Sequence, residues 1–425
     1  MSPAIKCLIM LAIIALFFVT ELIPLAVTAM AGAIASGLLG FIPVKQVFSG
    51  LSNSTVVLFA GMFVVGASMF YTGLAQAIGN KVVGMCGTGE NSLMFGLMTV
   101  GTVLSAFLSN TGTAACLLPV VLGVCAAAKI PASRQLMPLA FACGWGGIIT
   151  LVGTPPNIIA QGAMQAAGLT NLFTFFEFAW IGIPVSIGGM LYMMFLGKYL
   201  LPKAELDADQ EIEQEVEAGE SSTAKMAISG VILVGVVLVM ASGTKAISLE
   251  MAAIIGALLC VLTGCLTEKQ AYASIDWVTI FLFAGMMPVS TAMAKTGAGA
   301  LIADWTVGLM GTSPHPLVLT AVLFILSCVL TQFMSNTASA ALLCPIGIAI
   351  AQTLGADPKP VLVAIAVAAS CAFASPVGTP PNTLVLGPGG YKFMDYVKAG
   401  TGLIIVCFVV SLVVIPMVWP FFPGK

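Results

Sequence analysis

The sequence predicts an all-α polytopic membrane protein, because its composition is too apolar for a water-soluble globule. Hydrophobic residues make up 59% of the 425 positions and charged residues only 8%, with a mean hydropathy of +1.10. Soluble domains carry about 25% charged residues. Apolar stretches of about 20 residues fit the hydrocarbon layer as helices, and the chain lacks the alternating pattern expected of a membrane barrel.

An internal repeat is the second observation that bears on the fold. The tripeptide Ser-Asn-Thr occurs at 109–111 and again at 335–337, and the pentapeptide Gly-Thr-Pro-Pro-Asn at 153–157 and again at 378–382. The two separations are 226 and 225 residues, so one half of the chain repeats the other nearly in register. In membrane proteins, such a duplication is typical of transporters whose binding site lies between the halves.

Apolar runs between polar or Gly/Pro breaks predict five spans in each half. The expected helices are 4–20, 24–41, 54–79, 136–151 and 171–200, then 226–243, 247–265, 276–300, 360–376 and 395–421.

Each half also has a long apolar stretch, 92–128 and 315–353, with the Ser-Asn-Thr tripeptide near its middle. Non-helical backbone at membrane depth survives only where protein or water satisfies it, which favours re-entrant hairpins with broken helices. Five spans plus one hairpin give an odd number of crossings per half. The second repeat is therefore expected to be inverted relative to the first.

The predicted domains follow from this repeat. Residues 1–201 form the first repeat and 226–425 the second, joined by an acidic, water-exposed linker at 202–225. Lysine and arginine positions give a weak positive-inside bias if this linker is cytoplasmic, and ten spans then place both termini outside the cytoplasm.

Charge and cysteine usage exclude several classes of function. The formal net charge is −2 and the acidic residues gather in the linker, so nucleic-acid binding is not expected. The eleven cysteines lie mostly in apolar stretches without a Cys-x-x-Cys pair, which indicates packing residues. His315, the single histidine, lies between two prolines and is expected in a loop.

The tripeptides carry hydroxyl and amide groups that both donate and accept hydrogen bonds. Their oxygens suit a hard monovalent cation such as sodium, while amide N–H, hydroxyl and helix N-terminal N–H groups suit an oxyanion. Ser105 and Thr331 lie one turn before the tripeptides and are expected to face the same sites. Residues 92–128 carry no charged side chain, so bound cations would have to balance an anion there.

The Gly-Thr-Pro-Pro-Asn pentapeptides predict unwound segments at 153–157 and 378–382. Each first proline restricts the preceding threonine, both prolines lack an N–H, and glycine permits unusual dihedrals. Upstream carbonyl groups are then left unpaired and become available as ligands.

Together these paired motifs resemble the divalent anion/sodium symporter family of the ion transporter superfamily, which includes dicarboxylate, citrate and sulfate carriers. The resemblance covers nearly the whole chain. It implies a homodimer with an elevator-type mechanism, in which one part holds the dimer and the other carries sodium and substrate. Two departures are the absence of an extra leading helix and Gly112, where the family usually has alanine.

The resemblance also implies roles for individual residues. The sodium ligands carried over by motif are Ser105, Ser109, Asn110 and Gly153 for one ion and Thr331, Met334 (through its backbone), Asn336 and Gly378 for another. The substrate-binding residues carried over are Ser109, Asn110, Thr111, Thr154, Ser335, Asn336, Thr337, Thr379 and Pro380.

The function expected is sodium-coupled symport of a small divalent anion, foremost a C4-dicarboxylate such as succinate, malate or fumarate. Sodium is the coupling ion and no organic cofactor or enzyme activity is expected. The protein should be a multi-pass protein of the plasma membrane, the inner membrane in a bacterium. A sulfate or citrate carrier, an anion exchanger and a proton-coupled or arsenite-type permease remain alternatives, and an intramembrane enzyme or channel is the alternative from another class.

Overall fold

The computed structural model describes residues 1–422 apart from 87–88, 203–221, 245 and 311–314, and these residues form helices and their connections. The predicted linker 202–225 therefore lies largely outside the described residues. The helices of the first half are α1 (Pro3–Thr20), α2 (Leu25–Leu38), η1 (Val44–Gln46), η2 (Ser49–Ser52), α3 (Ser54–Tyr71), α4 (Leu74–Cys86), α5 (Glu90–Ser105), α6 (Asn110–Ala128), η3 (Ala132–Arg134), α7 (Leu136–Gly147), α8 (Pro155–Ala166), α9 (Ala179–Phe195) and η4 (Gly197–Tyr199).

The second half gives the same succession of long helices, with one short helix added. Its helices are α10 (Thr223–Ser242), α11 (Leu249–Leu262), α12 (Glu268–Ser274), α13 (Trp277–Thr296), α14 (Ala298–Met310), α15 (Pro316–Thr331), α16 (Asn336–Leu354), α17 (Pro358–Ala369), α18 (Pro380–Leu386) and α19 (Phe393–Val418).

Membrane-length helices confirm the predicted class of protein. Seven of the described helices are long and apolar enough to cross a bilayer, namely α1, α3, α6, α10, α13, α16 and α19. Helix α1 shows how such a helix satisfies two environments. Cys7, Ile14 and Phe18 are buried against the protein, whereas Ile9 and Ile13 on another face are 45% and 49% exposed. A helix that is apolar all round is suited to lipid on its outer side.

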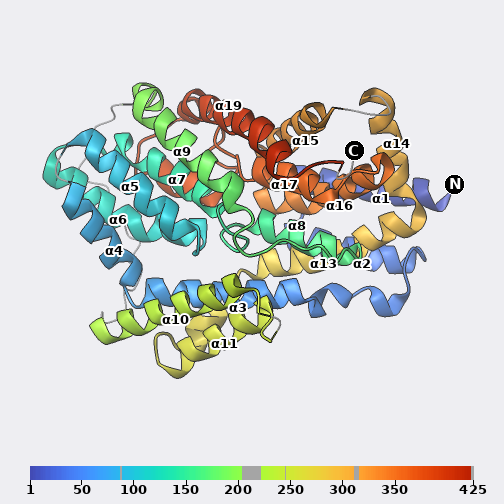
Figure 1. Ribbon diagram of the computed structural model, residues 1–425, viewed down its shortest axis with the longest axis horizontal. Helices are drawn as coiled ribbons and strands as arrows, with labels where there is room; N and C mark the ends of the chain where they lie inside the picture. Colours follow the sequence, from blue (N-terminus) through green and yellow to red (C-terminus); the bar gives the residue numbers. More distant parts are fainter. Residues whose placement is uncertain (87–88, 203–221, 245, 311–314, 423–425) are drawn as a thin grey trace.

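Two groups of helices are evident from the contacts. Helices α1–α3 and α10–α13 form one group, in which α2 packs on α13 and α3 on α11, while α4 packs mainly on α5 and α6, and α14 mainly on α16. Helices α5–α9 and α15–α19 form the other, in which α5 packs on α7, α15 on α17 and α9 on α19. In Figure 1, α3, α10 and α11 lie along one side of the molecule, away from α9, α15 and α19. We call the group that contains α3 and α11 the outer group, and the group that contains α5–α9 and α15–α19 the hairpin group.

The sequence-based spans 54–79 and 276–300 were wrong in one respect, because each is two helices. The chain turns at Thr72–Gly73 in the first half and at Gly297 in the second, where the glycines have φ of +77° and +76°. Left-handed backbone favours glycine because a Cβ is disfavoured there. The matching Thr-Gly pairs thus mark matching helix breaks.

The other boundaries also shift toward shorter helices. The predicted spans 136–151 and 360–376 end early, at Gly147 in α7 and Ala369 in α17. After each, a non-helical segment leads to a new helix that begins at the first proline of the pentapeptide, α8 or α18. Proline is well suited to the first helical position, where no N–H is required.

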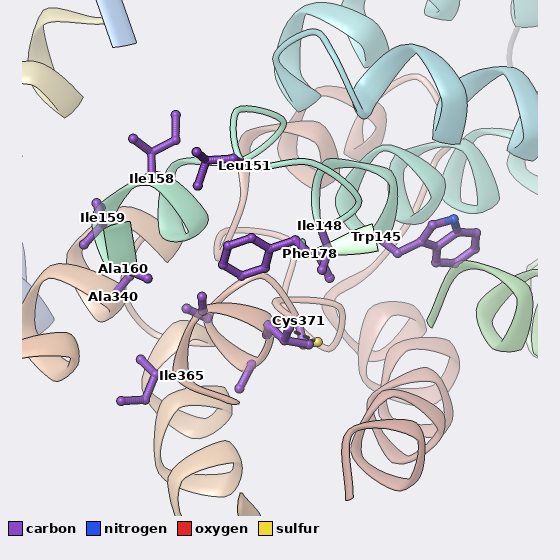
Figure 2. Packing of buried hydrophobic residues seen from close by; sticks show 14 of the residues in the cluster. Trp145, Ile148, Leu151, Ile158, Ile159, Ala160, Phe178, Ala340, Ile365 and Cys371 are labelled. Atoms are coloured by element: carbon purple, nitrogen blue, oxygen red, sulfur yellow. Dashed lines mark hydrogen bonds between the residues drawn. The ribbon is translucent and has the colours of Figure 1, made fainter. Parts of the chain in front are cut away.

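One hydrophobic core joins the two halves in the hairpin group. Figure 2 shows Ile148 and Phe178 of the first half close to Cys371 of the second. Across the same region the Phe141 and Phe373 rings lie 5.3 Å apart, centroid to centroid. Such interleaving means that the hairpin group is a single packed unit, although its helices come from both ends of the chain.

Polar groups also connect the halves. The Tyr391 hydroxyl donates to Ser133 O at 2.6 Å and accepts from Met137 N–H at 2.8 Å. This side chain, which precedes α19, thereby supplies the backbone at the start of α7 with hydrogen bonds that the helix itself cannot provide.

Candidate functional site

A cavity of about 950 Å³ lies where the two motifs meet. It is the convergence point that the duplication predicted, because residues of both tripeptides and both pentapeptides line it. The lining residues from these motifs are Ser109, Asn110, Thr111, Gly153, Thr154, Pro155, Ser335, Asn336, Thr337, Gly378, Thr379 and Pro380.

Each tripeptide forms the tip of a helical hairpin. Helix α5 ends at Ser105, and the Ser109 side chain caps α6 by accepting from Gly112 N–H at 3.0 Å. In the second hairpin, Ser335 caps α16 and accepts from Ala338 N–H at 3.1 Å. Serine is a preferred N-cap because its oxygen satisfies an orphan helix N–H. Its hydroxyl proton is then free to be donated to a ligand.

The first tip carries a cluster of oxygen atoms. The Ser105 hydroxyl lies 2.7 Å from Asn110 Oδ1 and 2.7 Å from the Cys143 carbonyl of α7. The same atom position of the Asn110 amide also lies 3.2 Å from the Gly153 carbonyl. Four chain segments thus contribute one oxygen each.

The second tip repeats this cluster. The Thr331 hydroxyl lies 2.8 Å from Asn336 Oδ1 and 2.6 Å from the Ala369 carbonyl of α17. The Asn336 amide reaches the Gly378 carbonyl at 3.2 Å. Matching residues of the two halves therefore build matching sites, with threonine in place of serine.

The two asparagine amides can be oriented in two ways. With the nitrogen inward, Asn110 donates to Gly153 O, Cys143 O and Ser105 Oγ, and Asn336 donates to the equivalent atoms. With the oxygen inward, the Ser105 hydroxyl has one proton for two acceptors, and the remaining oxygens face one another. The first arrangement satisfies the amides without an ion, whereas a monovalent cation would satisfy the second, so the oxygens present fit a sodium ion when the amide oxygens point inward.

Glycine is required where each unwound segment passes its hairpin. A Cβ on Gly153 would lie 2.9 Å from the Ala106 carbonyl, and one on Gly378 would lie 2.8 Å from the Thr331 carbonyl. Real Cβ atoms do not approach backbone that closely. Only glycine at 153 and 378 therefore brings the carbonyl groups of these two residues beside the tips.

The asparagine of each pentapeptide holds the unwound segment in place. Asn157 Nδ2 donates to the Thr150 carbonyl at 2.9 Å and the Ile148 carbonyl at 3.2 Å. Asn382 Nδ2 donates to the Ala372 and Ser375 carbonyls, both at 2.9 Å. These buried donors replace the helical hydrogen bonds lost in the segment, which explains how it remains ordered.

The electrostatics of the cavity come from backbone dipoles. The N-termini of α6, α8 and α16 reach the cavity, and each carries about half a positive charge. Neither Thr154 nor Thr379 uses its side chain as a cap. Among the described lining residues the single charged side chain is Asp276, which accepts from the N–H and hydroxyl of Thr279. An anion would therefore meet dipoles, hydroxyl groups and amides rather than lysine or arginine.

The structure brings together all the predicted site residues, in different degrees of exposure. Ser105, Thr331, Gly153, Gly378, Thr154 and Thr379 are buried, whereas Thr111 and Pro380 are exposed. Met334 is buried in the turn before Ser335, and its N–H donates to the Leu330 carbonyl at 3.1 Å.

Sequence reasoning missed several supporting residues. Thr150 donates to the Ala106 carbonyl and accepts from Gly153 N–H at 3.1 Å. In the second half this bracing comes instead from Gln332, which donates to Cys371 O at 2.9 Å and accepts from Ala374 N–H at 3.1 Å. The two residues occupy different positions in the repeat, so no motif match could have found them.

His315 caps α15 and its Nδ1 accepts from Leu317 N–H at 3.3 Å. All eleven cysteines are free thiols. Among the described residues no cluster of histidine, cysteine, aspartate and glutamate suits a metal ion.

The fold, the two-tipped cavity and the comparisons with known proteins define a multi-pass membrane transporter. The family model described as "Citrate transporter" matches residues 15–346 and 236–423, and the chain belongs to this CitMHS family. The expectation of a transporter rather than an enzyme is thereby confirmed, as is its location as a multi-pass protein of the plasma membrane.

Several curated relatives match almost end to end. An "Uncharacterized transporter" of Haemophilus influenzae is 32% identical, over 97% of this chain and 91% of the relative. The "Uncharacterized transporter YfbS" of Escherichia coli is 27% identical, over 97% and 98%. The "Sodium-dependent dicarboxylate transporter SdcS" of Staphylococcus saprophyticus is 26% identical, over 96% and 84%.

Solved structures support the fold alone. The YdaH transporter of Alcanivorax borkumensis superposes with a TM-score of 0.66 at 15% identity, covering 98% of both chains. MtrF of Neisseria gonorrhoeae gives 0.60 at 15% identity, covering 92% of this chain and 86% of that one. Both are membrane transporters by their descriptions.

Proposed function

We propose that the protein is a sodium-coupled symporter of a small divalent anion, foremost a C4-dicarboxylate such as succinate, malate or fumarate. One observation carries this proposal: two oxygen clusters of matching composition flank a cavity that is rich in helix N-termini and contains no described cationic side chain. The sodium-dependent dicarboxylate transporters among the relatives support the same substrate class.

The cations are assigned to the two clusters. One sodium ion would bind Ser105, Asn110 and the Gly153 carbonyl, and a second would bind Thr331, Asn336 and the Gly378 carbonyl, with Ser109 and the Met334 backbone completing the sets. Each cluster has more acceptors than protons when its asparagine oxygen points inward. A bound cation relieves that excess.

The anion is assigned to the space between the tips. Its carboxylates would accept from the hydroxyl groups and amides of the two tripeptides and from the starts of α8 and α18. The residues proposed are Ser109, Asn110, Thr111, Thr154, Ser335, Asn336, Thr337, Thr379 and Pro380. Because fixed positive side chains are lacking there, the two sodium ions would supply the charge that makes dianion binding favourable, which couples the two events.

For the transport cycle we propose an elevator in a homodimer. The outer group would hold the dimer, while the hairpin group would move as one body with its cargo. Two features support this division: the hairpin group shares one core from both halves, and the two repeats follow the same helix order. We propose further that the repeats are inverted, so that one tip faces each side of the membrane.

Other anions are tested alongside dicarboxylates. The family description names citrate, so a citrate carrier is the second candidate, and a sulfate carrier or an exchanger of the same fold would use the same sites. A channel would show flux without ion coupling.

The deciding experiment is uptake of radiolabelled succinate by the purified protein in proteoliposomes. An inward sodium gradient should drive uptake, an equal potassium gradient should not, and unlabelled malate and fumarate should compete. Stronger competition by citrate or sulfate would reassign the substrate. Uptake only into vesicles preloaded with an anion would indicate an exchanger, and equal uptake in both gradients would refute sodium coupling.

A further inference from the structure

The two hairpin tips differ at the residue that follows each tripeptide. Gly112 follows the first, and its counterpart in the second is Ala338, 226 positions later. Ala338 is fully buried and has its methyl group. At Gly112 the space that a methyl group would take belongs to another helix.

That space is filled by the ring of Phe70. A Cβ added to Gly112 would lie 2.5 Å from Phe70 Cε2 and 2.7 Å from Cζ, both closer than real Cβ contacts. Phe70 lies at the end of α3 in the outer group, whereas Gly112 lies in the first turn of α6 in the hairpin group. The contact therefore crosses between the two groups beside the first tip.

Both residues also line the cavity. Three further phenylalanines of the first half, Phe59, Phe63 and Phe107, line it as well. The outer-group residues that line the cavity from the second half are smaller or polar, among them Thr279. The part of the lining that comes from the first half is thus the aromatic part, and within it the Phe70 ring lies against the tip at Gly112.

We infer that Phe70 and Gly112 form a size filter for the substrate. This inference rests on the proposed function and adds a determinant of substrate size to it. The ring fills the volume next to Gly112, the residue that follows the first tripeptide, so a short dianion fits between the tips while a dianion with a bulky substituent meets the ring. Glycine at 112 is what allows the ring to lie this close to the tip.

A double-mutant cycle tests the contact. Gly112→Ala should displace the Phe70 ring from its position beside the tip. Both the melting temperature and the rate of succinate uptake should fall. Phe70→Ala removes the ring, so adding Gly112→Ala to it should change either quantity far less than it does in the natural protein. Ala338→Gly is the matched control, since it alters the same atom at the tip without a ring and should show no such coupling to Phe70→Ala.

Substrate size provides the second readout. Phe70→Ala should strengthen inhibition of succinate uptake by phenylsuccinate by at least about tenfold, which is the scale of discrimination that pocket shape provides. The Michaelis constant for succinate should change by less than about threefold, because the ring bounds the site without holding the carboxylates.

The outcomes separate this inference from the proposed function. Additive effects of Phe70→Ala and Gly112→Ala on melting temperature, or unchanged phenylsuccinate inhibition in Phe70→Ala, would overturn the filter. If the natural protein took up no succinate, the proposed function would fail and the filter for dicarboxylates with it, while the melting-temperature cycle would still decide whether the ring and the tip are in contact.

Discussion

Arg134 and Lys359 lie 225 residues apart at the N-terminal ends of α7 and α17, and both are buried in ion pairs. Arg134 Nε lies 2.7 Å from Glu90 Oε1, and Lys359 Nζ lies 2.8 Å from Glu177 Oε1. The repeat has thus kept a cation at this position while its carboxylate partner comes from a different element in each half. Arg134 thereby joins the start of α7 to Glu90 in α5, and Lys359 joins the start of α17 to Glu177, which precedes α9. Helices α7 and α17 each lead into an unwound segment.

The Lys359 pair predicts a stability effect. Lys359→Met should lower the free energy of unfolding by about 1–3 kcal/mol, because it leaves the partly buried Glu177 carboxylate without its charged partner. The melting temperature of the detergent-purified protein measures this. Lys45→Met, at an exposed lysine, is the control and should have little effect. An equal loss in both variants would show that the buried pair contributes nothing specific.

The same pair predicts a pH dependence. Burial by itself raises the pKa of Glu177, but hydrogen bonds from Lys359, Thr174 N–H and Trp419 outweigh it, and the net pKa lies below the ordinary value. The stabilisation is then complete above the ordinary glutamate pKa, about 4.3, and is lost as the pH falls through the lowered folded value. Melting curves of the natural protein and Glu177→Gln should differ constantly above pH 6 and converge in acid.

The oxygen clusters predict loss of coupled transport. Asn110→Ala and Asn336→Ala should each abolish sodium-driven uptake while the protein remains folded, because each removes the central amide of a cluster. Ser105→Ala and Thr331→Val should raise the sodium concentration for half-maximal uptake, by about tenfold for a lost ligand contact. Ser411→Ala, which removes a buried hydroxyl with no described partner, is the control. Full activity in either asparagine variant would refute the site assignment.

Asn157 and Asn382, which hold the unwound segments in place, predict that an isosteric substitution lowers transport. Asn157→Asp keeps the shape of the side chain but replaces its two donated hydrogen bonds with an oxygen that faces the Ile148 and Thr150 carbonyls. Uptake should fall by more than about tenfold, since the buried acceptors lose their partner. Asn53→Asp is the matched control, because the Asn53 side chain accepts from Thr55 N–H and aspartate caps a helix equally well. Similar losses of uptake in both variants would argue against a specific role of Asn157 in holding the unwound segment.

Gln165 predicts a shift between conformations. Its Oε1 in α8 accepts from Thr55 Oγ1 at 2.7 Å and Ser54 Oγ at 3.3 Å, so it joins the hairpin group to the outer group. If the hairpin group moves, these bonds belong to this conformation alone. Gln165→Met should disfavour it by about 1 kcal/mol per lost bond.

Thiol labelling can detect that shift. Cys116 lines the cavity in this conformation, so its labelling rate should fall severalfold in Gln165→Met when it is the sole cysteine. Gln332→Met is the comparison, because the Gln332 side chain donates to Cys371 O within the hairpin group. Its loss should not change the Cys116 labelling rate in the same way. Unchanged labelling in Gln165→Met would mean that the two bonds do not favour this conformation.

Much of the site could be predicted from sequence because duplication marks it twice. A single Ser-Asn-Thr has many explanations, but two copies in step with two Gly-Thr-Pro-Pro-Asn segments identified Asn110, Asn336, Gly153 and Gly378, and the structure places them together. Hydropathy likewise predicted the class of protein, since lipid imposes helices.

What sequence could not predict depends on contacts across the fold. The bracing role passes from Thr150 in the first half to Gln332 in the second, so it has no fixed position in the repeat. The partner of Lys359 is Glu177, 182 residues away, and no local pattern links them. The breaks at Gly73 and Gly297 were missed because hydrophobicity continues through them, while the backbone turns.

The scarcity of charge in the hairpins has an electrical consequence. Residues 92–128 and 315–353 contain no aspartate, glutamate, lysine or arginine, and the Asp276 carboxylate at the cavity belongs to the outer group. If the hairpin group carries cargo as proposed, these two segments themselves bring no ionised side chain through the membrane field. The fixed charges elsewhere in the hairpin group would return with the empty carrier, so the current per cycle would count the sodium ions in excess of the charge on the anion.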